Sequence, residues 1–288
     1  MRAPPVGFDY AAVGHVTVDI LPGGERRVGG SAFYSAIQAA RLGLSTVVVT
    51  RGVPGEIEEL LAPYAGELDE LRVAAAEHTT TLETSGSGAG RRQRLVGWAG
   101  ELSPEVTSQL VPEAGVVHLA PVAREITTCR PREGTFVGLT PQGLVRRWNG
   151  PGSSVEPARA TPEQEALGAL CNAIVLSVEE REYCEGLLAG GLGAGAVVAI
   201  TAGPAGGSLL LPEGGELEIG GPRVSAPADD LGAGDVFAAA MFAELHRGAE
   251  PVPAAAFAAA AAAVRLEGTG PGGIGDRIAI EQRLRAAA

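Results

Sequence analysis

Short β-branched runs alternate along this chain with segments in which apolar residues recur at helical spacing. The runs are almost continuously apolar, which is typical of strands buried on both faces of a parallel sheet. Predicted strands occupy 10–13, 46–50, 116–119, 135–139, 173–176 and 197–201, and predicted helices occupy 32–42, 57–64, 162–170, 179–188, 235–247 and 253–266. Strands that alternate with helices in this order predict an α/β fold, with a mostly parallel sheet flanked by helices on both faces.

Period-two alternation interrupts this rhythm in two segments, TTTLET at 79–84 and RQRLV at 92–96, which flank the sequence SGSGAG. This is the pattern of a β-hairpin with one polar face. We therefore expect a single domain over 1–288, carrying a small antiparallel β lid formed by about 17–30 and 75–100. The alternative is a solvent-facing flap without function.

Composition excludes several functions. All 22 basic residues are Arg, so chemistry that needs a lysine amine, including the phosphate-binding Lys of a P-loop, is absent. The net charge of −12 disfavours nucleic acid and anionic membranes as partners. The longest apolar run, 254–264, is far shorter than the roughly 20 residues of a membrane span. Three cysteines without a CxxC pair and an opening sequence without a signal-peptide core predict a cytoplasmic protein.

Candidate chemistry is concentrated in the stretch ADDLGAGDVF, where a glycine turn opens an amphipathic helix. The first amides of a helix lack partners and carry the positive end of its dipole. The amides of Gly232, Ala233 and Gly234 are therefore a candidate anion hole for a transferring phosphoryl group. Asp235 at the same helix start is a candidate base for an attacking hydroxyl. The alternative is that Asp235 only stabilises the start of the helix.

A second glycine turn suits a compact polyol. Gly29 and Gly30 precede a predicted helix, and Asp19 lies ten residues before them. Small residues permit close approach, and a carboxylate accepts hydrogen bonds from vicinal hydroxyls. A tight turn beside a surface acid is the competing interpretation.

Two further clusters follow predicted strands, where ligands of parallel sheets bind. Thr201, Gly203 and Gly206 form a turn suited to a phosphate or nucleotide, although many such turns bind nothing. Glu180 follows the strand AIVL and is a candidate to hold magnesium through water. It could equally complement the dipole of a helix that opens there.

Together and in this order, the clusters resemble the ribokinase, or PfkB, family of small-molecule kinases over nearly the whole chain. The family's D-T-x-G-A-G-D signature reads here DDLGAGD at 229–235, and its Gly-Gly signature reads GGSAFYSAIQAARLG at 29–43. The T-x-G-x-x-G piece and the hairpin fall where the family has its nucleotide loop and lid. The sequence departs at Tyr34, where the family has Asn, and at SVEE (177–180) in place of N-x-x-E.

The resemblance implies an ATP- and Mg²⁺-dependent kinase. Asp235 would be the catalytic base, the amides at 232–235 the anion hole, and the loop at 201–206 a contact for the ATP phosphates. Asp229 would be a candidate ligand of a monovalent cation such as K⁺. The lid would close over the site as part of a monomer, or pair between the two copies of a homodimer.

The acceptor follows from the other cluster. Asp19, Gly29, Gly30, Tyr34 and Gln142 are the expected substrate contacts, and they favour a hydroxyl of a neutral sugar or cyclitol. The lid arginines at 91, 92 and 94 would instead favour a sugar phosphate if they point inward. A nucleoside is a further alternative within the family.

Other classes fit less well. The first strand lacks the G-x-G-x-x-G of a nicotinamide-binding fold, no serine stands in a G-x-S-x-G setting, and the four His residues are scattered. The remaining rival is a non-catalytic sugar-binding sensor on the same fold. The retained Asp235 argues against it, because a sensor needs no base.

Overall fold

The computed structural model describes residues 7–86, 90–221, 224 and 229–287. Within them, nine strands form one sheet in the order β16-β15-β14-β13-β9-β8-β1-β4-β5. All neighbouring pairs from β14 to β5 are parallel, while β15 and β16 add antiparallel to β14. These strands are β1 (Phe8–Val13), β4 (Thr46–Gly52), β5 (Glu70–Ala75), β8 (Ala114–Leu119), β9 (Phe136–Leu139), β13 (Ala173–Ser177), β14 (Val197–Thr201), β15 (Gly207–Leu210) and β16 (Glu216–Ile219).

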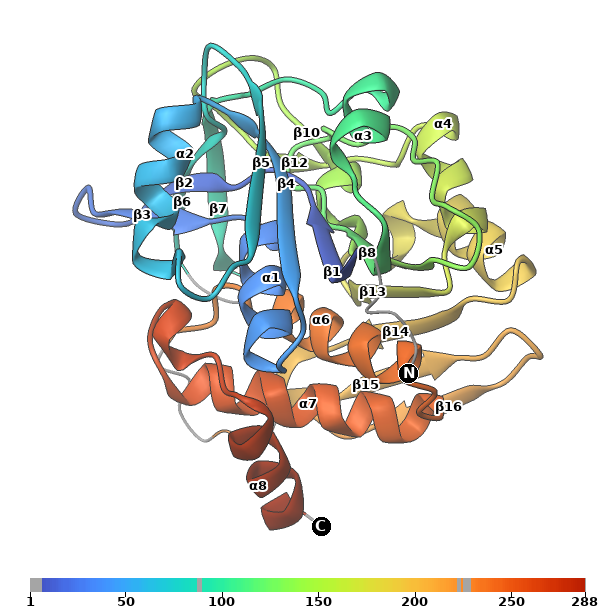
Figure 1. Ribbon diagram of the computed structural model, residues 1–288. Helices are drawn as coiled ribbons and strands as arrows, with labels where there is room; N and C mark the ends of the chain where they lie inside the picture. The colour runs from blue at the N-terminus through green and yellow to red at the C-terminus, as the bar shows by residue number, and fades with distance from the viewer. Residues whose placement is uncertain (1–6, 87–89, 222–223, 225–228, 288) are drawn as a thin grey trace.

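Helices cover both faces of this sheet (Figure 1), which confirms the predicted fold class. Tyr10 and Ala12 of β1 face the helices α1, α6 and α7, whereas Ala11 and Val13 face the side of α5 and the α3 segment. Alternate residues are buried in opposite directions, so central strands such as β1 and β13 are almost continuously apolar. The helices are α1 (Ser31–Arg41), α2 (Pro54–Leu61), α3 (Pro104–Leu110), α4 (Pro162–Glu165), α5 (Glu185–Gly193), α6 (Ala233–His246), α7 (Pro251–Glu267) and α8 (Arg277–Ala287).

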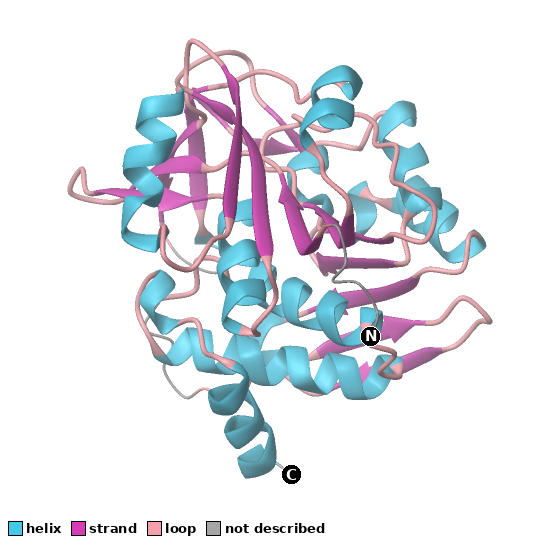
Figure 2. Ribbon diagram, in the orientation of Figure 1, coloured by secondary structure: helices cyan, strands magenta, loops and turns pink. Residues whose placement is uncertain are grey.

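A second, five-stranded sheet in the order β11-β7-β6-β2-β3 stands beside the larger one (Figure 2). The predicted hairpin is present as β6 (Thr81–Ser85) and β7 (Arg92–Gly97), and its turn at 87–89 lies outside the described residues. It is joined by β2 (Thr17–Ile20), β3 (Arg26–Gly29) and β11 (Ser153–Ser154). β2 pairs with β6 in parallel and the other pairs are antiparallel. A short ribbon of β10 (Arg146–Arg147) and β12 (Glu156–Pro157) completes the strands.

The predicted helix at 179–188 begins later than expected. Glu180 does not open a helix: its carboxylate turns back and accepts from the amide of Ser177 at 2.9 Å. A single 3₁₀ turn follows at Arg181–Tyr183, and α5 starts only at Glu185. A carboxylate that caps its own preceding strand keeps the backbone in turns.

Two helices owe their close packing to alanine. α6 and α7 bury their Ala-rich faces against each other and the sheet, and small side chains let the two backbones approach. Among the described residues, no helix combines the length and apolar character that crossing a membrane requires. Cys129, Cys171 and Cys184 are buried free thiols.

Candidate active site

A cavity of about 150 Å³ lies where the carboxyl ends of the parallel strands meet the second sheet. It brings together clusters that are more than 200 residues apart in sequence. The predicted site residues that line it are Asp19, Gly30, Tyr34, Gln142, Glu180, Thr201, Gly232, Gly234 and Asp235. The two glycine signatures and the strand-end acids therefore converge on one space, as open α/β sheets predict.

The glycine turn at 232–234 opens α6 as predicted. Gly232 precedes the helix with φ of +76°, a left-handed conformation that costs other residues free energy. A Cβ on Gly232 would lie 2.3 Å from the ring of Tyr34, so this position has no room for a side chain. A Cβ on Gly234 would meet no protein atom within 4 Å, so the space beside this cavity-lining residue is open. The Ala233 amide, by contrast, donates to the Asp230 carbonyl at 3.4 Å.

Asp235 stands in the first turn of α6 and faces the cavity. Burial raises its pKa to about 6, against the hydrogen bond from Ser31 that lowers it, and the nearby Glu180 adds to the rise. Ser35 donates to the Asp235 carbonyl at 3.4 Å. Both serines belong to α1, so the Gly-Gly signature directly supports the carboxylate of the GAGD signature. A carboxylate with a pKa near 6 is ionised at neutral pH yet basic enough to take a proton.

The acceptor side is built around Asp19, which is 6% exposed. The Thr17 hydroxyl donates to its Oδ1 at 2.8 Å, and burial raises its pKa. A Cβ on Gly29 would lie 2.2 Å from the Asp19 carboxylate. The Gly-Gly pair is therefore what lets β3 lie against this acid, and it leaves the buried carboxylate beside the cavity.

Glu180 and Gln142 line the same cavity and meet through a side-chain hydrogen bond. Burial raises the pKa of Glu180, and hydrogen bonds from the Ser177 amide and from Gln142 work against that rise. The described residues contain no group of three or more His, Cys, Asp or Glu side chains placed to hold a metal ion.

Two predicted nucleotide-loop glycines do not line the cavity. Gly203 belongs to a 3₁₀ turn after β14, and nothing lies within 4 Å of where its Cβ would be. Gly206 packs tightly on β16, since its Cβ would lie 2.3 Å from the carbonyl of Ile219. Thr201 alone of the three faces the cavity, and contact of the two glycines with a nucleotide stays a prediction.

The three lid arginines, Arg91, Arg92 and Arg94, differ in whether they line the cavity. Arg91 lines the cavity and forms an ion pair with Asp230 at the entrance to the glycine turn. Arg94 instead points outward, where it is 57% exposed and pairs with Glu83 at 2.9 Å. The Arg92 residue is also exposed.

Two arginines were missed by the sequence analysis. Arg146 lines the cavity, donates to the Val122 carbonyl at 2.9 Å and lies near Glu180, Asp19 and Asp235. It follows the segment that contains Gln142, so proximity in sequence was the available signal. Arg265 is fully buried beneath the glycine turn. The signal there was the single charge of the predicted Ala-rich helix 253–266, placed directly after its apolar run.

A larger hollow of about 740 Å³ lies between β3, α2 and the turn at Pro271–Gly273. Two charged side chains on its wall are paired, Arg26 with Glu56 at 2.7 Å and Arg27 with Glu25 at 2.6 Å. It contains none of the clusters that carry chemistry, so size alone does not make it the active site.

Residues 160–275 match the pfkB family carbohydrate kinase profile. This segment includes Glu180, Thr201 and the whole glycine turn with Asp235. Among curated proteins no relative matches the chain.

Solved structures extend the likeness to the rest of the chain. A pyrophosphate-dependent kinase of the ribokinase family, complexed with a pyrophosphate analog and myo-inositol, is 20% identical, with a TM-score of 0.74 over 91% of this chain and 96% of that one. Ribokinase from Arabidopsis thaliana, complexed with ribose and ATP, is 18% identical, with a TM-score of 0.71 over 97% and 99%. A nucleoside kinase from Burkholderia thailandensis, complexed with inosine, is 15% identical, with a TM-score of 0.75 over 96% and 97%. Residues 160–275 are thus similar to pfkB family carbohydrate kinases, and the chain has the ribokinase-like fold.

Proposed function

We propose that this protein is a PfkB-type kinase that transfers the γ-phosphoryl group of ATP to a hydroxyl of a neutral sugar or cyclitol. The observation that carries the proposal is that Asp235, Gly232 and Gly234 line the same cavity as the buried Asp19. The acceptor hydroxyl would be held between the two carboxylates, and Asp235 would take its proton as the phosphoryl group arrives.

Charge supports a neutral acceptor. The described residues that line the cavity include four carboxylates and two guanidiniums, contributed by Asp19, Glu180, Asp230, Asp235, Arg91 and Arg146. An acceptor with its own phosphate would enter an excess of negative charge, and Arg91 is already paired with Asp230. A neutral polyol meets hydrogen-bonding groups without that repulsion.

A nucleoside acceptor is the second candidate, since one structural relative is a nucleoside kinase. It is less favoured here, because a base needs an aromatic face to stack on. Of the described residues that line the cavity, only Tyr34 is aromatic. Its ring is covered on one side by Gly232 and is 4% exposed as a residue.

Magnesium would be held mainly by the donor phosphates, with Glu180 as a water-mediated contact, because Mg²⁺ commonly keeps several waters beside one or two carboxylates. Bound there, it would offset negative charge on the transferring group. Arg146, between Glu180 and Asp235, would supply a fixed positive charge on the same path. Arg91 holds the lid strand against the entrance of the glycine turn through Asp230, which would help exclude water.

Product formation across a panel of pentoses, hexoses, inositols, nucleosides and sugar phosphates tests the proposal. Each acceptor is assayed with Mg-ATP and, because one relative is pyrophosphate-dependent, also with Mg-pyrophosphate. Turnover of a neutral polyol with ATP, lost in Asp235→Asn, is expected. Tight binding of a sugar by calorimetry with no turnover from either donor would favour a sensor and reject the kinase mechanism.

A further inference from the structure

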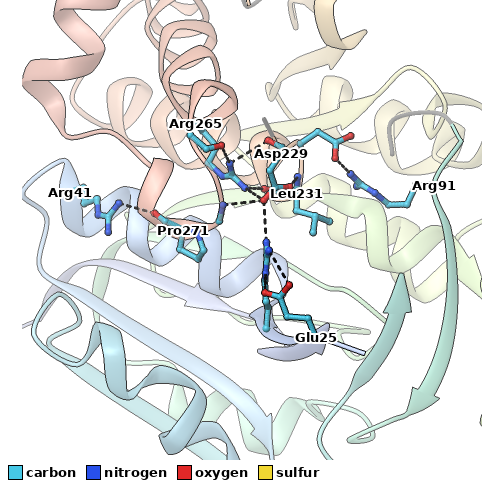
Figure 3. A network of polar contacts seen from close by, with 11 residues as sticks. Glu25, Arg41, Arg91, Asp229, Leu231, Arg265 and Pro271 are labelled. Carbon is cyan, nitrogen blue, oxygen red and sulfur yellow. Dashed lines mark hydrogen bonds and ion pairs between the residues drawn. The ribbon is translucent and has the colours of Figure 1, made fainter. Parts of the chain in front are cut away.

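The loop that leads into the anion hole is held from below by one buried guanidinium. Arg265 is 0% exposed and extends from the last turn of α7 (Figure 3). Its Nη2 donates to the Asp229 Oδ2 at 3.1 Å and to the Leu231 carbonyl at 2.6 Å. Its Nη1 donates to the Asp229 carbonyl at 3.3 Å and to the Gly268 carbonyl at 3.2 Å. Four oxygens from two segments thus surround one positive charge.

These oxygens are the kind that bind a monovalent metal ion. Backbone carbonyls together with a carboxylate replace the hydration shell of such ions in proteins. The sequence analysis named Asp229 as a candidate K⁺ ligand, but its Oδ2 accepts from Arg265 and, at 3.0 Å, from the amide of Gly270. Its Oδ1 accepts from the Leu231 amide at 3.0 Å. Both carboxylate oxygens are therefore engaged, and the arrangement does not fit K⁺ beside Arg265.

We propose that Arg265 is a positioning residue that acts as a built-in cation: its guanidinium takes the place of a monovalent metal ion beneath the anion-hole loop. Turnover, which rests on the proposed function, then needs no K⁺, and neither does the fold of this loop.

The guanidinium links the anchor to the groups that form the site. Its Cζ lies 5.8 Å from the centre of the Tyr34 ring, and that ring packs against Gly232. Leu231, whose carbonyl takes the shortest of the four bonds, directly precedes Gly232. A displacement of Arg265 would therefore shift the amides that face the phosphoryl group.

Electrostatics explain why a permanent charge suits this position. Asp229, Asp230 and Asp235 lie within seven residues of one another at a helix start that must also accept a phosphate. Arg265 and Arg91 neutralise the first two at short range, and Arg27 lies 3.6 Å from Asp229. A guanidinium stays charged at any working pH, and being covalently attached it does not depend on salt concentration.

Thermal melting tests the proposal without a substrate. The intact protein is melted in chlorides of K⁺, Rb⁺, Na⁺ and tetramethylammonium at equal ionic strength. The expected result is the same Tm in all four salts, because the oxygens around Arg265 already accept hydrogen bonds from its guanidinium. A saturable rise in Tm with K⁺ or Rb⁺ over tetramethylammonium would overturn the proposal.

A variant sharpens the test. Arg265→Ala removes the guanidinium and leaves the oxygens with space for an ion. We expect a lower Tm in tetramethylammonium, and a partial, saturable recovery with K⁺ or Rb⁺. The matched control is Arg277→Ala on α8, which loses an ion pair with Glu244 at 2.6 Å and a contact 5.0 Å from the Phe257 ring but no loop carbonyl. Its Tm should fall equally in every salt. An Arg265→Ala protein that responds like this control would contradict the proposal.

If Arg265→Ala fails to fold, Arg265→Lys keeps a charge in place and should stay indifferent to K⁺. A K⁺-selective rise in its Tm would count against the proposal. Turnover is then compared in the same salts for the wild type. Turnover that requires K⁺ overturns the built-in cation, whereas no turnover in any salt with any acceptor rejects the proposed function and leaves the melting result standing.

Discussion

Asp229 and Asp235 stand at the two ends of one glycine turn, six residues apart, and their surroundings act on them in opposite directions. Burial would raise the pKa of Asp229, but the amides of Leu231 and Gly270 and the Arg265 guanidinium together hold it below its usual value. Burial wins at Asp235 and raises its pKa to about 6. The Asp229 carboxylate is engaged in structural hydrogen bonds, whereas the Asp235 carboxylate is left able to accept a proton. Such divergent pairs are how anchor and base are told apart within one motif.

The largest expected effect comes from removing the reactive carboxylate. Asp235→Asn should lower kcat by roughly 100- to 10,000-fold, the usual range for a general base, with little change in acceptor affinity by calorimetry. Because a buried carboxylate that prefers its proton costs stability when ionised, the same variant should melt higher than the wild type at pH 8. Equal kcat in the two proteins would remove Asp235 from the mechanism.

The position of Asp235 was predictable, whereas the origin of its properties was not. The glycine turn and the apolar period fixed where α6 begins, so a first-turn acid facing a strand-end cavity followed from local rules. The Gly-Gly signature and Asp19 were assigned to the same site on similar grounds. Which side chains shift the pKa depends on contacts with α1, such as Ser31, that only the folded chain brings into place.

The misses have physical causes of the same kind. Long arginine side chains reach far from their own backbone, so the sequence around Arg146 and Arg265 does not indicate which groups they contact. The helix expected at 179–188 failed because the Glu180 side chain bonds backward to Ser177. The strand β5 was missed because its residues are half-buried and it carries charges at both Glu70 and Arg72, so it lacks the continuous apolar run that marked the other parallel strands.

The next largest effects are expected from substituting Gly234 and Gly232, the two glycines between Asp229 and Asp235. Gly234→Ala should leave the Tm nearly unchanged, because its Cβ meets no protein atom. It should still lower kcat on the order of 100-fold, because the methyl group would enter the space of the phosphoryl group and displace it. Thermal melting checks the expected Tm, and steady-state kinetics checks the expected kcat.

Gly232→Ala is its matched contrast. Here the new Cβ would collide with the Tyr34 ring, and the alanine backbone would be held at a positive φ. The Tm should therefore fall together with the activity. Full activity in Gly234→Ala would mean that the turn does not face the transferred group.

Removing the anchor acid should act mainly on stability. Asp229→Asn leaves the guanidinium of Arg265 buried with carbonyl partners only, and a buried charge without its counter-ion typically costs about 3 kcal/mol. Urea unfolding should show this loss, with a smaller decrease in kcat as the loop loosens. The exposed pair Arg159–Glu185 supplies the control, since Glu185→Gln should change the free energy of unfolding very little. A similar small change in Asp229→Asn would deny Asp229 its role as an anchor.

The pH dependence of the wild type is the mildest test, and it separates the two carboxylates without a mutation. Asp235 must be ionised to accept a proton, so kcat should fall about tenfold per unit as the pH drops below about 6. The contribution of Asp229 to the free energy of unfolding changes over a different pH range. Because its folded pKa is depressed, that stability is fully present above its ordinary pKa near 3.8 and is lost only as the pH falls further. At pH 5 the enzyme should therefore be folded with its anchor intact and its base protonated. A Tm that collapses together with kcat between pH 6 and 5 would show that the two acids do not have the separate roles argued from their surroundings.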